Sequence, residues 1–197
     1  MEFRGLLLAL AAASLAAGAA RAEESHVDRV ELDSARSEAE FSVKVMWLIG
    51  VGGHFGKVSG TVAVDRFRSQ AVVDARIDAN AVSMSNDSYE EWVKSAEFFD
   101  VANHPDIHFV SDSFPLQRLL RGGELTGVLT IRGVEQKTRF ELEPAECDHP
   151  AYDCPISVHG AIHRSEFGMR SRRGTLSDKV DLRFKVFAVP SASRLNQ

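Results

Sequence analysis

The sequence predicts an all-β fold, an eight-stranded antiparallel barrel with one short helix near residues 89–96. Apolar and polar residues alternate along most of the chain, which is typical of strands that bury one face. Glycines fall between or at the ends of the alternating runs, where turns are expected. A single segment of helical period interrupts the pattern. Together these features favour a sheet that closes on itself.

Residues 1–22 have the three parts of a secretory signal peptide. Arg4 supplies the positive charge, residues 6–20 are apolar, and the sequence A-R-A at 20–22 suits cleavage. The apolar run is shorter than the ~20 residues that a membrane-spanning helix needs. Residue 23 is glutamate, not the cysteine that carries the lipid of a bacterial lipoprotein. We therefore expect cleavage after Ala22 and export to the periplasm as a soluble, unanchored chain.

The length and charge of the chain after this cleavage site limit the kinds of partner that it can bind. Removing 22 of the 197 residues leaves 175, which suits one domain, with the barrel over 23–190 and a frayed tail over 191–197. It also leaves 21 of the 23 basic and 27 of the 28 acidic side chains, a net charge of −6. A phosphate backbone calls for a basic surface, so we expect no nucleic-acid partner. The sequence leaves the oligomeric state open.

Eight segments have the period of strands. In one of them, Val73, Ala75 and Ile77 alternate with charged residues at 74, 76 and 78. The eight segments cover residues 41–47, 58–64, 73–79, 107–111, 125–131, 140–142, 156–163 and 180–187. Turns are expected at Gly52-Gly53, at 121–123 and at 132–133. A barrel of eight strands either fills its interior with side chains or holds one small ligand.

The segment NDSYEEWVKSAEFF, residues 86–99, breaks the alternation. Ser88 is expected to cap a helix, because Glu91 three residues later completes a capping box. The apolar stripe of this helix comprises Tyr89, Trp92, Val93 and Ala96. A helix of two or three turns is unstable alone, so its stripe must pack on the barrel, where it could plug or gate an opening.

Both cysteines, Cys147 and Cys154, lie in the segment CDHPAYDC. In an exported protein such a pair predicts a disulfide, and closing so short a loop stabilises the fold by about 2.5 kcal/mol. A metal site formed by the two thiolates with His149 is the alternative. It would require reduced thiols in an oxidising compartment.

Three motifs follow one another along the chain. They are SAEFFDVANHPDIHFVSDSF at 95–114, LTGVLTIRGVEQK at 125–137 and HRSEFGM at 163–169. In order and spacing they resemble the YceI family of exported bacterial polyisoprenoid-binding proteins, and the resemblance runs from about Val27 to Ala188. It implies a lipocalin-like, extended antiparallel barrel that holds a long apolar molecule, such as an isoprenoid quinone or a fatty-acid derivative. It implies no catalysis and no catalytic cofactor.

The aromatic residues and methionines are the candidates for the lining of such a barrel. Phe98 and Phe99 are adjacent, so on an extended chain one ring enters the core and the other lines an opening. Flexible methionines and broad aromatic rings suit an adaptable apolar surface. The candidate lining residues are Phe41, Val43, Trp47, Met84, Trp92, Phe98, Phe99, Phe109, Phe167 and Met169.

The seven histidines raise the alternative of a metal site or an enzyme. His104 and His108 are four residues apart, but Pro105 and the strand that follows exclude chelation from one helix. His159 and His163 fall on the solvent face of a predicted strand. The chain has no H-E-x-x-H, no G-x-S-x-G and no glycine-rich phosphate loop. We therefore expect no metal and no catalytic residue.

Three functions remain. The preferred one is a periplasmic carrier or store for an isoprenoid or isoprenoid quinone, held non-covalently in the barrel. The second is an accessory interaction module for an inner-membrane b-type cytochrome or another electron-transfer partner. The resemblance suggests it, although no docking patch is identified in the sequence. The remote third is a lipid hydrolase, for which Ser85, His54 and Asp87 are the available triad.

Overall fold

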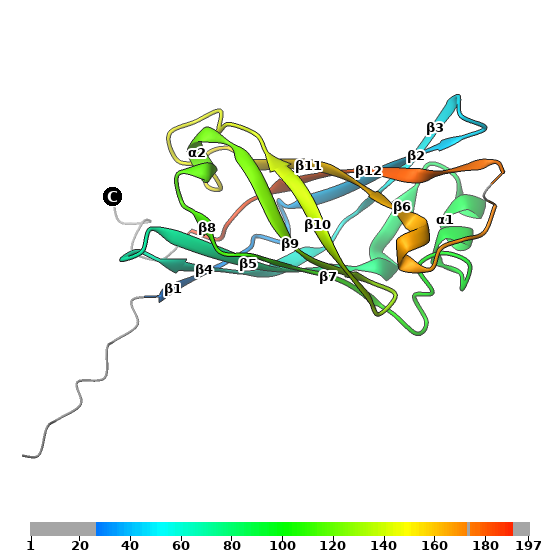
Figure 1. The fold of residues 1–197 in the computed structure, drawn as a ribbon, viewed down its shortest axis with the longest axis horizontal. Coiled ribbons are helices and arrows are strands. Elements are labelled where there is room, and N and C mark those ends of the chain that lie inside the picture. The colour runs from blue at the N-terminus through cyan, green and yellow to red at the C-terminus, as the bar shows by residue number, and fades with distance from the viewer. Residues whose placement is uncertain (1–26, 173, 191–197) are drawn as a thin grey trace, which may run out of the picture.

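The computed structural model describes residues 27–172 and 174–190. The expected signal peptide over 1–22 and the expected tail over 191–197 lie outside these residues. The described chain forms an elongated antiparallel sheet that curls into a barrel, with few helices (Figure 1). The predicted all-β antiparallel fold is confirmed.

Twelve strands make up the sheet over the described ranges. In chain order they are β1 (Val27–Glu31), β2 (Glu38–Val45), β3 (Ile49–Phe55), β4 (Val58–Asp65), β5 (Gln70–Asp78), β6 (Val82–Met84), β7 (Asp106–Ser111), β8 (Phe114–Pro115), β9 (Gly123–Ile131), β10 (Val134–Leu142), β11 (Ile156–His163) and β12 (Leu176–Val186). Across the sheet the order is β1-β4-β5-β7-β9-β10-β11-β12-β2-β3-β6, with β8 beside β5. The paired strands run antiparallel.

Four strands exceed the predicted eight, namely β1, β3, β6 and β8. β6 and β8 have three and two residues, which is too short to show a period. β3 was missed because Gly52 and Gly53 were expected to form a turn, whereas both lie inside the strand. A Cβ on Gly53 would lie 2.8 Å from the ring of Phe41 on β2, so glycine is required there by the close approach of that ring.

In the part of the chain that the structure describes, two α-helices and two 3₁₀-helices connect the strands. They are α1 (Asp87–Lys94), α2 (Arg118–Arg121), η1 (Ala79–Ala81) and η2 (Arg164–Phe167). Asn86 caps α1, because its side chain accepts hydrogen bonds from the N–H groups of Ser88 and Tyr89 at 2.9 and 3.3 Å. The prediction that Ser88 is the cap was therefore wrong by two residues. Within residues 27–172 and 174–190, no helix has the length and apolar character needed to cross a membrane.

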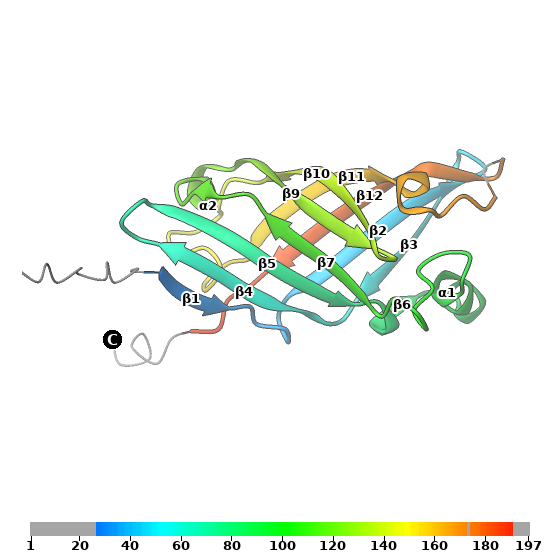
Figure 2. The ribbon, with the colours of Figure 1, turned by 60° about the horizontal axis from the view of Figure 1, so that its bottom comes forward.

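The barrel is held together at the end where both described termini lie, opposite α1 (Figure 2). Leu32, just after β1, forms an isolated antiparallel bridge with Ala188, just after β12. The N–H of Asp33 donates to the carbonyl of Phe187 at 2.9 Å, and the N–H of Val189 donates to Glu31 at the same distance. The first strand and the last thus meet at this end.

Candidate ligand-binding cavity

A cavity of about 430 Å³ occupies the interior of the barrel. It extends from Leu32 and Tyr152, near the described termini, to Trp92 on α1 and Phe99 just after that helix. Small-molecule sites in proteins have volumes of roughly 300–1,000 Å³, so this cavity is large enough for a ligand.

The alternating strands make the lining apolar. On β9, Leu125 and Leu129 line the cavity, and Val180 and Leu182 do the same from β12. Among the described residues the charged members of the lining are Glu40, Arg164 and Arg172. The interior therefore offers mainly hydrophobic contact to a ligand.

Three phenylalanine rings pack over glycines on neighbouring strands. A Cβ at Gly160 on β11 would lie 2.5 Å from the ring of Phe140, which real Cβ atoms do not approach. The absent side chain lets the ring lie against the barrel wall, which leaves the centre of the barrel open. The three pairs are Phe41 with Gly53, Phe109 with Gly127, and Phe140 with Gly160.

Aromatic rings line the cavity at the α1 end. Phe99 contacts Phe41 and Phe55, with ring centroids 6.1 and 5.6 Å away. Phe98 meets Trp92 edge-on at 4.4 Å. Both Phe98 and Phe99 line the cavity, although an extended chain would have pointed them apart. They follow α1 in a turn, where the N–H of Phe99 donates to the carbonyl of Val93 at 3.0 Å.

Glu90 fixes α1 against β6. Its carboxylate accepts a hydrogen bond from Lys94 at 2.6 Å and another from the backbone N–H of Met84 at 3.3 Å. These bonds, the one from Lys94 first, hold the pKa of Glu90 below its ordinary value. The helix is thereby tied to a strand whose Met84 side chain lines the cavity.

Trp92 connects α1 to the segment that precedes β12. Its Nε1–H donates to Glu97 at 2.7 Å, and the guanidinium of Arg172 lies 4.7 Å from its ring centroid. This cation–π contact joins two segments that are far apart in the sequence. Because Trp92 and Arg172 both line the cavity, they form part of its rim at the α1 end.

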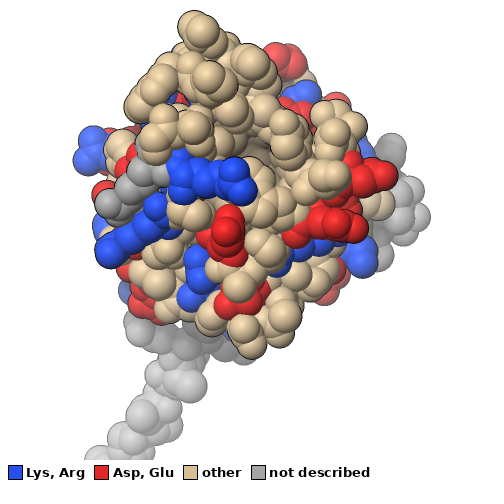
Figure 3. All heavy atoms as spheres, turned by 90° about the vertical axis from the view of Figure 1, so that its right-hand side faces the viewer, with Lys and Arg blue, Asp and Glu red and all other residues tan. Residues whose placement is uncertain are grey.

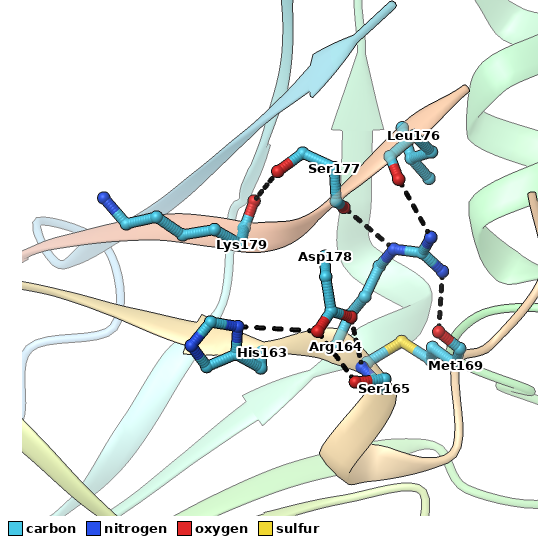
Figure 4. A network of polar contacts seen from close by, with 8 residues as sticks. All are labelled: His163, Arg164, Ser165, Met169, Leu176, Ser177, Asp178 and Lys179. Atoms are coloured by element: carbon cyan, nitrogen blue, oxygen red, sulfur yellow. Dashed lines mark hydrogen bonds and ion pairs between the residues drawn. The ribbon is translucent and has the colours of Figure 1, made fainter. Parts of the chain in front are cut away.

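Arg164 is a buried charge at the same end, with 2% of its surface exposed. Its guanidinium donates to the carbonyls of Ser177 at 2.9 Å, Met169 at 2.6 Å and Leu176 at 3.2 Å (Figure 4). A buried guanidinium requires such acceptors, and here they tie η2 to the start of β12. The sequence motif HRSEFGM contains this residue, but the sequence predicts no role for it. In that motif Arg164 stands between His163 and Ser165, with Glu166 next, so no local pattern indicates that it is buried.

Asp178 extends this network. Its carboxylate accepts hydrogen bonds from the backbone N–H and the hydroxyl of Ser165, at 2.9 and 2.8 Å, and lies 3.4 Å from Nδ1 of His163 (Figure 4). Burial acts to raise the pKa of Asp178, but the bonds from Ser165 and the charges of His163 and Arg164 outweigh it. The pKa therefore lies below its ordinary value.

The disulfide closes the opposite end of the cavity. Cys147 and Cys154 are bonded, as predicted. Pro150, Ala151 and Tyr152, inside the loop that they close, line the cavity. The N–H of Ala188 donates to the carbonyl of Ala151 at 2.8 Å, which holds this loop against the end of the barrel.

The ten candidate lining residues divide into two groups. Trp47 lies in the turn between β2 and β3 with 67% of its surface exposed, because the strand ends at Val45. Phe167 is fully buried in η2 and does not line the cavity. The other eight line the cavity, and they are Phe41, Val43, Met84, Trp92, Phe98, Phe99, Phe109 and Met169.

Four of the described histidines, His108, His149, His159 and His163, each lie beside a different carboxylate. Nε2 of His108 is 2.7 Å from Asp74, across the β5–β7 ladder. His159 and His163 are exposed on β11, as their predicted strand face requires. In the part of the chain that the structure describes, no three His, Cys, Asp or Glu side chains converge in a way that could hold a metal ion.

Comparison with known proteins agrees with this architecture. A family model described as the YceI-like domain matches residues 31–188. A UPF0312 protein of Pectobacterium atrosepticum is 28% identical over 182 residues, which cover 89% of this chain and 92% of the relative. Protein YceI of Salmonella arizonae is 27% identical over 186 residues, with 91% and 94% covered.

Two solved structures share the fold. BcnA of Burkholderia cenocepacia superposes with a TM-score of 0.64 at 23% identity, covering 79% of this chain and 98% of that one. A polyisoprenoid-binding domain of Saccharophagus degradans gives a TM-score of 0.62 at 14% identity, with 84% and 99% covered. At these identities the likeness concerns the fold.

Proposed function

Because the chain belongs to the family of YceI-like domains, we propose that it is a periplasmic carrier or store for a long apolar lipid, an isoprenoid or isoprenoid quinone. The observation that carries the proposal is the apolar interior of about 430 Å³. Open apolar surface inside a folded chain gains contacts when an apolar molecule fills it. The neighbour described as a polyisoprenoid-binding domain supports this class of ligand.

The lipid is held without covalent chemistry, with its tail along the barrel. Each methylene-sized group that leaves water contributes about 0.8 kcal/mol, so the tail supplies most of the affinity. Polar and charged lining residues at the α1 end, Arg164, Arg172 and Thr175, suit the polar end of a quinone or isoprenol. The tail then points towards the disulfide loop.

Export rests on the sequence of residues 1–22. Cleavage after Ala22 gives a chain that begins at Glu23, and the disulfide suits an oxidising compartment such as the periplasm. Intact-mass measurement of protein from a periplasmic fraction tests this step. A chain that retains residues 1–22 in the cytoplasm contradicts it.

Native mass spectrometry of the purified protein tests the bound lipid. We expect added mass that organic solvent removes, and lipid analysis of the extract identifies the class. The delipidated protein is then offered an isoprenoid quinone and, separately, a hydrocarbon without a polar end. Retention of the quinone with weaker retention of the hydrocarbon supports the orientation above. Protein that carries no extractable lipid and takes up neither compound refutes the proposal.

A further inference from the structure

The turn between β2 and β3 exposes four consecutive apolar side chains, which we call the apolar tip: Met46, Trp47, Leu48 and Ile49. Their exposed fractions are 63, 67, 88 and 61%. Single exposed apolar residues are ordinary, but a contiguous group on a projection marks a surface that meets another apolar phase. Figure 3 shows an uncharged projection at the top of this end of the molecule.

The residues of the tip are not those that favour the backbone conformation of this turn. Met46 and Trp47 have φ values of 48° and 65°, the left-handed region that glycine and asparagine prefer. The turn is held in place by the N–H of Met46, which donates to the carbonyl of Thr175 at 2.7 Å, and by the N–H of Leu48, which donates to Val45 at 3.2 Å. Bulky apolar residues thus occupy strained positions without packing on the core, which points to a function outside the fold.

The shape and size of the tip favour a bilayer over a protein partner. Even at about 150 Å² for each side chain, four side chains offer about 600 Å². A stable protein interface buries about 800 Å² on each partner. The tip is also convex and stands at one end of the molecule, as Figures 1 and 3 show. A convex apolar tip that carries tryptophan fits the interfacial region of a membrane, where this residue is enriched.

Basic side chains flank the tip. Lys44 is exposed on β2, and Arg170 and Arg172 are exposed in the segment between η2 and β12. The hydrogen bond from Met46 to Thr175 places that segment beside the turn. Acidic residues at this end lie on and just after α1: Glu90 pairs with Lys94 and Glu97 accepts from Trp92, and Asp87 and Glu91 are exposed. Lysine and arginine near a membrane surface are attracted to anionic headgroups.

The tip also adjoins the cavity. Val45 immediately precedes it and pairs with Leu176 on β12, and both of these residues line the cavity. We propose that the apolar tip inserts into an anionic phospholipid bilayer and docks the α1 end of the barrel on the membrane surface. Lipid exchange between bilayer and cavity rests on the proposed function, whereas docking itself does not.

Flotation with vesicles tests the docking. The full chain is mixed with vesicles of phosphatidylglycerol and phosphatidylcholine, or of phosphatidylcholine alone. The test variant is Trp47→Ser with Leu48→Ser. The matched control is Phe67→Ser, since Phe67 is 88% exposed between two arginines in the turn between β4 and β5, at the opposite end of the barrel. We expect the test variant to bind the anionic vesicles about tenfold more weakly or worse, and the control to bind as the native chain does.

Two further measurements make the test specific. In a Trp92→Phe background the emission of Trp47 is expected to shift to the blue on vesicles and to be quenched by brominated lipids. Lys44→Gln with Arg170→Gln is expected to weaken binding to the anionic vesicles only. Equal vesicle binding by the Trp47/Leu48 variant overturns the inference. So does a dimer of this chain that the same variant dissociates while no vesicle binding occurs.

The lipid content of each variant separates this inference from the proposed function. Tip variants that lose vesicle binding but keep extractable lipid support both. A native chain that binds vesicles through the tip but carries no lipid supports the docking alone and refutes the carrier. A native chain that carries lipid but does not bind vesicles supports the carrier and refutes the docking.

Discussion

The ring of Phe99 stands edge-on to the ring of Phe41, with the two planes at 86° and the centroids 6.1 Å apart. One ring belongs to the turn after α1 and the other to the wall of the barrel, so the contact joins the end of the cavity to its side. It places an aromatic surface at this part of the cavity wall, where the proposed ligand would make apolar contacts.

Phe99→Asp is expected to remove most of the retained lipid, because an unpaired carboxylate disrupts an apolar environment. Phe99→Leu keeps the apolar character, costs about 1 kcal/mol of stability and retains the lipid. Lipid per mole and thermal unfolding are measured for both. Since Phe99 also packs on Phe55, Phe99→Asp is compared only at temperatures where it remains folded. Full retention by the aspartate variant contradicts the apolar lining at this position.

His104→Ala and His108→Ala are expected to leave the lipid content unchanged. His108 pairs with Asp74 outside the cavity, and neither histidine lines it. The loss of such a half-exposed pair changes the free energy of unfolding by about 1 kcal/mol or less. Loss of the lipid in either variant, with the fold intact, indicates a polar site in the loop before β7 or on β7 itself.

Replacing both Cys147 and Cys154 with serine is expected to lower the free energy of unfolding by about 2.5 kcal/mol in the chain-entropy model. Because Pro150 and Tyr152 line the cavity, loosening the loop is also expected to accelerate lipid release. Denaturant unfolding and the rate of transfer to empty vesicles are the measurements. When the unsubstituted protein is denatured without a reductant, neither cysteine should react with an alkylating reagent. Labelling of both cysteines would refute the disulfide.

Acid is expected to weaken the attachment of η2 to β12. The pKa of Asp178 is lower in the folded chain than its ordinary value, so its carboxylate stabilises the fold at neutral pH. That contribution is lost as the pH falls below about 4, towards the folded pKa. Asp178→Asn removes it at every pH, so the variant should be less stable than the native chain at pH 7 and should show a shallower decline below pH 4. If the free energy of unfolding of the two chains depends on pH in the same way, Asp178 does not make this contribution.

Gly160→Ala is expected to push the ring of Phe140 off the barrel wall, because the new Cβ would lie 2.5 Å from it. Overpacking of this kind costs about 1–3 kcal/mol, and the displaced ring narrows the interior. Gly50→Ala is the control, since nothing lies within 4 Å of the added carbon on β3. Thermal unfolding and the length of the longest lipid retained distinguish the two variants. Identical behaviour would show that the ring moves freely.

The sequence predicted the wall of the barrel better than its ends. Alternation identifies residues such as Leu125 and Leu129, because the period of two decides which side chains face inward. The disulfide was predictable because the two cysteines are close in the sequence and because residues 1–22 have the composition expected of an export signal. Both of these signals are local.

The rest depended on contacts between distant segments. Trp47 continues the apolar period of β2 but falls in a turn, and the sequence gives no sign of that turn because its residues are not those that such turns favour. Gly53 has the composition of a turn, but the ring of Phe41 on the paired strand requires a glycine there. Arg164 is buried only because three carbonyls of other segments surround it. None of these features is visible in a window of neighbouring residues.

The position of β12 in the sheet determines when, during synthesis, the cavity of the barrel can form. A ribosome releases the chain from its N-terminus, so β2 is made long before β12, yet β12 fills the position between β11 and β2. Until residues 176–186 are available, the wall has an open side and the interior is exposed to water. Pairing β2 with β12 is also the kind of long-range contact that forms slowly. A chain cut short before Leu176 therefore has no enclosed interior, and under the proposed function a lipid can enter only after synthesis is complete.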